Sequence, residues 1–77
     1  MSGDLGSDFS SVYRRLFEAA GVQKQTELAT ALGVAQSNIS RARKRGKIPE
    51  SWLLQCQIRF SVNPLWILYG DKYQRKL

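Results

Sequence analysis

Hydrophobic residues recur every three or four positions through the first quarter of the chain, which is the spacing of one face of an α-helix. Just before this stripe, Ser7 and Asp8 have side chains that can cap a first turn, and Gly21 suits the end of a helix. The pattern predicts an amphipathic helix over about 8–20. Its apolar face contains Phe9, Val12, Tyr13, Leu16, Phe17 and Ala20. Its polar face, expected to meet water, includes Arg14, Arg15 and Glu18.

Two shorter helical patterns follow and meet at Gly33. The first begins at Gln25, with Leu28, Ala29 and Leu32 on one face. A glycine at 33 allows the positive φ that ends a helix and turns the chain. The second pattern runs from about 36 to 44 or 45, and its narrow apolar side has Ile39 and Ala42. Together these features predict a helix-turn-helix over 25–44.

The rest of the chain predicts two more helices. Pro49 suits the first position of a helix that continues to about Phe60, and Asn63 followed by Pro64 predicts a short helix ending at Gly70. Residues 1–7 are predicted to be flexible and 71–77 to be a loose basic tail. The sequence therefore predicts an all-α, compact five-helix domain over 8–70.

The second helix of the motif has a polar face suited to DNA. On a helical wheel that face includes Gln36, Ser37, Ser40, Arg41 and Lys44, and it has no carboxylate. The major groove of B-DNA is about 12 Å wide and displays hydrogen-bond donors and acceptors. We therefore expect base contacts from Gln36, Ser37, Arg41 and Ser40. An ordinary helical hairpin within a small bundle is the alternative interpretation of the pattern.

Positive charge is concentrated at the same place. The formal net charge is +6, and residues 36–47 contribute five cationic side chains and no carboxylate. Residues 1–35 have a net charge of −1 and residues 48–77 of +2. This distribution is typical of a protein that binds a polyanion. The expected phosphate contacts are Gln25, Lys24, Arg43, Lys44, Arg45 and Lys47. For Gln25, a bridge to Gln36 and a plain exposed position at the helix start remain open.

Composition argues against several other functions. The chain has no histidine, and its one cysteine, Cys56, fits a buried core position better than a reactive one. The six carboxylates are scattered, so we expect no enzyme, no metal site and no cofactor. No apolar run reaches the roughly 18 residues of a membrane span. The polar N-terminus does not resemble a signal peptide, which predicts a cytoplasmic protein.

These residues together resemble the N-terminal DNA-binding domain of bacteriophage CI-type repressors, within the lambda-repressor-like helix-turn-helix group. The resemblance covers about 12–70 and rests on 25–29, 32–34, 39–41, 44–46, 48–49, 52–54 and 66–70. It implies a five-helix domain that binds an inverted-repeat operator in double-stranded DNA as a homodimer. It also implies base contacts from Gln36, Ser37 and Arg41, with Gln25 on the backbone.

Two positions depart from the family's pattern. Ala35 replaces the usual hydroxyl residue at the start of the recognition helix, and Ala42 stands where the family often has a tryptophan. The family's C-terminal oligomerisation domain is not among these residues, which leaves a fragment and a short stand-alone regulator both open.

The sequence thus predicts a transcriptional regulator, a phage-type repressor acting in the bacterial cytoplasm on nucleoid DNA. An antitoxin-like or other protein-interaction module with secondary DNA binding is the alternative. An RNA-binding helical domain is a weaker alternative, because such proteins usually expose stacking aromatics and 36–47 has none. The operator sequence, the sign of regulation and the dimer interface do not follow from the sequence.

Overall fold

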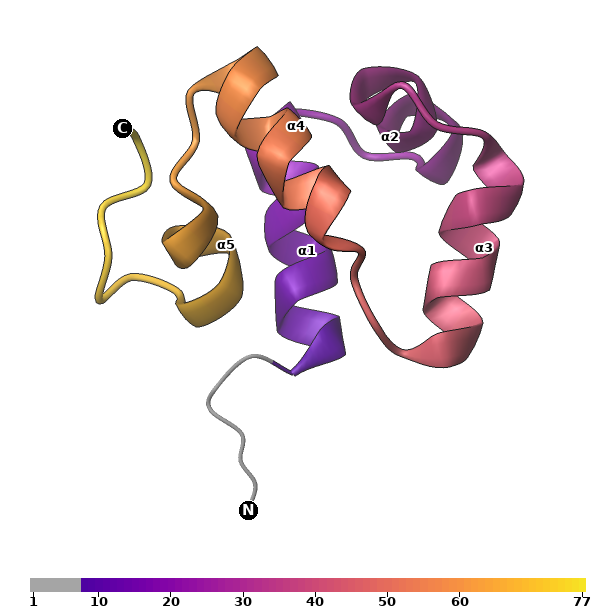
Figure 1. The fold of residues 1–77 in the computed structure, drawn as a ribbon, viewed down its shortest axis with the longest axis horizontal. Coiled ribbons are helices and arrows are strands. Elements are labelled where there is room, and N and C mark those ends of the chain that lie inside the picture. Colours follow the sequence, from indigo (N-terminus) through magenta and orange to yellow (C-terminus); the bar gives the residue numbers. More distant parts are fainter. Residues whose placement is uncertain (1–7) are drawn as a thin grey trace.

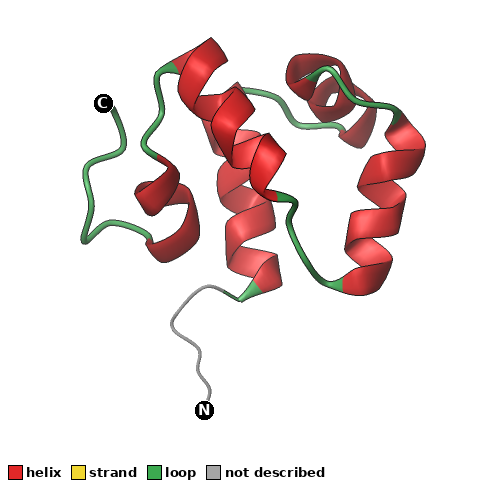
Figure 2. Ribbon diagram, viewed as in Figure 1, coloured by secondary structure: helices red, strands yellow, loops and turns green. Residues whose placement is uncertain are grey.

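The computed structural model describes residues 8–77, so the predicted flexible segment 1–7 lies outside the described residues. Five helices follow one another and are joined by short loops (Figures 1 and 2). They are α1 (Phe9–Ala20), α2 (Gln25–Leu32), α3 (Gln36–Arg45), α4 (Glu50–Phe60) and α5 (Pro64–Tyr69). The all-α, five-helix prediction is confirmed.

The helix ends follow from local chemistry. The Asp8 carboxylate accepts a hydrogen bond from the Ser11 amide at 3.2 Å, which caps α1 and lowers the pKa of Asp8. The Asn63 side chain caps α5 in the same way, by accepting from the Leu65 amide at 3.0 Å. One predicted boundary differs by a residue. Pro49 is the extended cap of α4 rather than its first helical residue, and α4 begins at Glu50.

The core lies where α1, α2, α4 and α5 converge. α1 packs against each of these helices, whereas α3 packs closely against α2 alone among the helices of residues 8–77. In Figure 1, α3 accordingly stands at one edge of the molecule. On α4, Leu54 and Ile58 lie outside this core and are 52% and 65% exposed. The buried hydrophobic residues are Val12, Leu16, Leu28, Ala29, Leu32, Ile39, Ala42, Trp52, Leu53, Cys56, Val62, Trp66 and Ile67.

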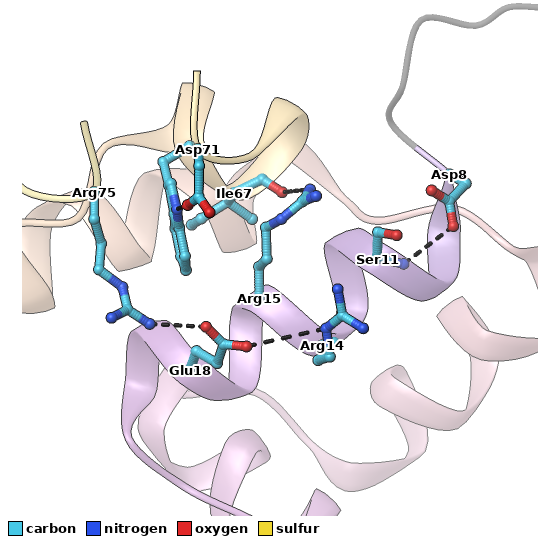
Figure 3. A network of polar contacts seen from close by, with 9 residues as sticks. Asp8, Ser11, Arg14, Arg15, Glu18, Ile67, Asp71 and Arg75 are labelled. Atoms are coloured by element: carbon cyan, nitrogen blue, oxygen red, sulfur yellow. Dashed lines mark hydrogen bonds and ion pairs between the residues drawn. The ribbon is translucent and has the colours of Figure 1, made fainter. Parts of the chain in front are cut away.

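Arg15 was predicted to face water, and this prediction is wrong. Its guanidinium is partly buried and donates hydrogen bonds to the carbonyl oxygens of Ile67 and Leu68, at 3.0 and 3.3 Å (Figure 3). These oxygens belong to the last turn of α5, where no intrahelical donor is left for them. Arg15 therefore links α1 to α5. The neighbouring Gly70 leaves room for it, because a Cβ there would come within 2.9 Å of an Arg15 nitrogen.

The prediction of a loose tail over 71–77 was wrong. The tail turns back along the segment after α4, where the Asn63 amide donates to the Arg75 carbonyl at 2.7 Å. The Leu77 amide likewise donates to the Ser61 carbonyl at 3.0 Å. The Arg75 guanidinium lies 4.4 Å from the centre of the Trp66 ring and donates to Glu18 of α1 at 2.9 Å. Figure 3 shows Arg75 and Asp71 extending from the tail toward α1 and α5. Partners distant in sequence hold this tail.

Candidate nucleic-acid interface

The turn between α2 and α3 is built from backbone bonds around one glycine. Gly33 has φ of 72°, a left-handed conformation that few residues other than glycine adopt readily. The amides of Gly33 and Val34 donate to the carbonyls of Thr30 and Ala29, at 3.1 and 3.0 Å. Ala29 is buried where the two helices meet. The local sequence thus sets the angle at which α3 leaves α2.

The outer face of α3 is polar and open to solvent. Ile39 and Ala42 are its buried residues, and every other residue of the helix is exposed. An open hollow of about 620 Å³ lies along this face and brings together Ser37, Ser40, Arg41, Arg43 and Lys44. Gln36 is exposed at the first position of α3, one turn before Ser40, and is not among the residues that line the hollow. The predicted base-contacting residues therefore lie along one exposed surface.

Cationic groups of this surface have no carboxylate beside them. Within residues 8–77, both ion pairs involve Glu18 of α1, and neither involves a cation of 36–47. Three of these cations, Arg43, Lys44 and Arg45, occupy the last turn of α3, where the helix dipole favours positive charge. Their charge is consequently available to an external anion.

Gln25 forms a bridge to α3, although not to Gln36, the partner that the sequence left open. Its side-chain amide donates to the Ser40 hydroxyl at 3.2 Å and accepts from the Arg43 guanidinium at 3.0 Å. The bridge thus reaches α3 one turn beyond Gln36. An amide at the start of α2 supplies both a donor and an acceptor to α3.

Lys24 lies at the same end of α2. Its backbone amide and that of Gln23 donate to the Glu27 carboxylate at 3.0 and 3.1 Å, so Glu27 supplies the acidic group that this helix start favours. Lys24 comes directly before Gln25 in the sequence, and its side chain is exposed to solvent.

Sequence reasoning missed the role of Tyr13, which it assigned only to the apolar face of the first helix. The Tyr13 ring packs against the core, and the Arg43 guanidinium lies 5.8 Å from its centre. The sequence shows an aromatic residue at every fourth position, Phe9, Tyr13 and Phe17. It does not show that Arg43 of α3 lies against this row.

A family model described as the bacteriophage CI repressor helix-turn-helix domain matches residues 11–75. The chain belongs to this family. The match covers all of α2–α5 and most of α1, and it includes most of the tail that packs against α1 and α5. Neither the curated proteins nor the solved structures gave a significant match.

Membership in the CI repressor family indicates a DNA-binding regulatory domain. None of the helices in 8–77 is both long and apolar enough to cross a membrane. The same residues contain no group of three or more histidine, cysteine, aspartate or glutamate side chains arranged to hold a metal ion.

Both departures from the CI repressor pattern concern α3, because Ala35 caps this helix and Ala42 lies within it. Ala35 is the extended cap residue of α3 and gives it no side-chain hydrogen bond. A hydroxyl at such a position typically contributes about 0.5–2 kcal/mol. Ala42 is 4% exposed and lies in the wall of a second cleft, of about 480 Å³, between α3 and the start of α4. Its lining includes Trp52 and the cationic residues Arg41, Arg45 and Lys47. Arg41 thus borders both hollows, and the basic surface continues past the end of α3.

Proposed function

We propose that this CI repressor domain binds double-stranded DNA sequence-specifically and regulates transcription, most simply as a repressor, in the bacterial cytoplasm. The observation that supports this proposal best is the exposed face of α3. It presents hydrogen-bonding and cationic groups and no carboxylate, on a helix that is fixed at one edge of the molecule. A helix with its side chains is about 10–12 Å across, which fits a major groove of about 12 Å.

Base recognition is assigned to four residues of α3. The Gln36 amide can donate to and accept from adenine, and the Arg41 guanidinium can donate twice to guanine. Each such contact discriminates against the wrong base by about 1–3 kcal/mol. Ser37 and Ser40 can pair with several bases, so they contribute less to the choice of sequence. Ser40 also accepts from Gln25.

Phosphate contacts are assigned to cations around this face. Lys44, Arg45 and Lys47 follow one another from the end of α3 into the next loop, and Lys24 lies at the start of α2. With Gln25 and Arg43 these form the predicted phosphate-contacting set. Neutralising five or six phosphates predicts a slope of log affinity against log salt of roughly −4.5 to −5.5.

Selection from a random double-stranded pool at about 150 mM salt tests the proposal directly. An enriched inverted repeat, with half-site centres one or more helical turns apart, supports a homodimer on an operator. An enriched single half-site supports sequence recognition by α3 but removes the homodimer. Binding to all duplexes without enrichment contradicts sequence-specific regulation and leaves a basic helical domain.

A further inference from the structure

α3 is attached to the domain along a narrow strip. Only Ile39 and Ala42 of its ten residues are buried, and the short side chain of Ala42 fills little space. These two side chains are its buried apolar contacts, so contacts away from the strip add restraint against rotation about the axis of α3. A rotation of roughly 20° moves a side-chain tip 5–6 Å from the axis by about 2 Å. Such a displacement breaks a hydrogen bond to a base edge, which needs about 2.7–3.2 Å.

Three polar contacts oppose this rotation, and Gln25 and Arg43 each take part in two of them. Gln25 joins Ser40 and Arg43, which are three residues apart on one side of α3. Arg43 also lies over the ring of Tyr13 in α1. We call Tyr13, Gln25, Ser40 and Arg43 the Arg43 cluster. It ties α3 to α1 and α2 beyond the apolar strip.

Tyr13 is itself held in place. Its ring stacks on Phe9, with centres 5.2 Å apart and planes at 17°, and meets Phe17 edge-on at 5.1 Å. The three aromatics follow one another at i, i+4 and i+8 along α1. A ring fixed on both sides presents a constant surface to the guanidinium.

We infer that Tyr13 is a positioning residue for base recognition, acting through Arg43 to fix the rotational setting of α3. This inference rests on the proposed DNA-binding function. Arg43 is exposed and has no carboxylate partner within 8–77, so it stays in the predicted phosphate-contacting set while its guanidinium contacts Gln25 and Tyr13. The Gln25 side-chain amide, which donates to Ser40 and accepts from Arg43, helps Arg43 to hold α3 in this setting.

The test measures the ratio of affinities for a selected duplex and a scrambled duplex. Tyr13→Leu removes the ring face but keeps an apolar side chain, and it lowers this ratio about two- to fivefold, the size of an exposed cation–π contact. The salt slope stays unchanged, because no phosphate-binding charge is lost. Tyr13→Phe keeps the ring face and therefore keeps the ratio. Val12→Ala, in the buried core beside Tyr13, lowers the thermal midpoint without changing the ratio.

Arg43→Lys gives a second, independent variant that leaves the core intact. It retains the charge but loses the planar fork, so it lowers the ratio at an unchanged salt slope. Combining it with Tyr13→Leu adds less than the sum of the two losses, because both variants weaken the contact between Arg43 and the Tyr13 ring. If Tyr13→Leu does not fold, Arg43→Lys alone decides.

Other results overturn the inference. An unchanged ratio in Tyr13→Leu, or in Arg43→Lys when that variant decides, excludes positioning while leaving DNA recognition by the wild-type protein intact. An equal fall in Tyr13→Phe assigns the effect to the hydroxyl group instead of the ring. Additive losses in the double variant exclude a shared contact. A wild-type ratio near one refutes both the inference and the proposed function, so the two failures are distinguishable.

Discussion

Gln36 and Lys47 mark two kinds of contact at the level of single residues. Both are exposed, and they lie on either side of the basic turn that ends α3. An amide recognises a base by direction, whereas an ammonium acts on a phosphate as a charge with little directional demand. The two side chains therefore predict different experimental signatures.

Replacing Gln36 with alanine is expected to remove discrimination at one base position by about 1–3 kcal/mol and to leave non-specific affinity nearly unchanged. Competition binding against single-base variants of the selected duplex measures this. Lys47→Ala is the matched control. It is expected to weaken all duplexes alike and to reduce the salt slope by about one. An equal loss on every sequence in Gln36→Ala refutes its base contact.

Cys56 shows how burial alone changes a residue's chemistry. Its side chain is fully buried in α4, and burial raises the pKa of the thiol from 9.0 to about 11. Between these values the unfolded chain has lost the thiol proton and the folded chain has kept it. The folded state therefore loses stability as pH rises through this window.

Urea unfolding at pH 8 and at pH 10.5 tests this linkage. The wild-type free energy of unfolding is expected to fall more between the two values than that of Cys56→Ala, which cannot ionise there. Comparing the two pH dependences cancels the titration of tyrosine and lysine. Parallel pH dependences contradict the assigned pKa.

At the level of elements, the shortest helix depends on a side chain from the first one. α5 has only six residues, too few to be stable alone, and its last carbonyls accept hydrogen bonds from Arg15 of α1. Hydrogen bonds from a charged donor in a partly buried place contribute more than neutral ones. The α1–α5 pair therefore depends on one guanidinium.

Arg15→Ala is expected to lower the free energy of unfolding by about 1–3 kcal/mol, as measured by urea denaturation. Arg14→Ala removes the same charge from the neighbouring position. Arg14 is exposed, and its ion pair with Glu18 is long, at 4.0 Å. Its loss is therefore expected to change the free energy of unfolding by about 0–1 kcal/mol. Similar losses in both variants contradict a specific link between α1 and α5.

At the level of the whole molecule, the tail completes the surface opposite α3. Trp66 is 4% exposed, and its indole nitrogen donates to Asp71 at 3.0 Å while Arg75 covers its ring. Figure 1 shows the tail beside α5 and far from α3. The tail thus stabilises the scaffold and lies away from the proposed DNA-binding face, despite its positive charge.

Arg75→Ala is expected to lower the free energy of unfolding by about 0.5–2 kcal/mol, through loss of its contacts with Trp66 and Glu18. Lys76→Ala removes an equal charge, while its backbone bridge to Val62 persists, and is expected to have little effect. Thermal unfolding compares the two. DNA affinity measured at equal folded fraction should match in both variants, and a selective loss in Arg75→Ala argues for a DNA contact.

The pattern of residues along the chain was enough to predict the five helices, the turn at Gly33 and the polar face of α3. These features depend on the spacing of apolar residues and on residues such as Gly33 and Asn63, whose effects act within one or two helical turns. The concentration of cations in 36–47 is likewise a property of the sequence alone.

The packing of the helices selects which long polar side chains contact the protein itself. Arg15 reaches carbonyls 52 and 53 residues away, and Arg75 reaches a carboxylate 57 residues away. In the same way, Arg43 contacts Gln25 and Tyr13 while it stays exposed on the outer face of α3. An arginine on a helical wheel looks the same in each case. Its flexible stem takes the partner that packing brings within reach, and helical periodicity contains no information about that partner.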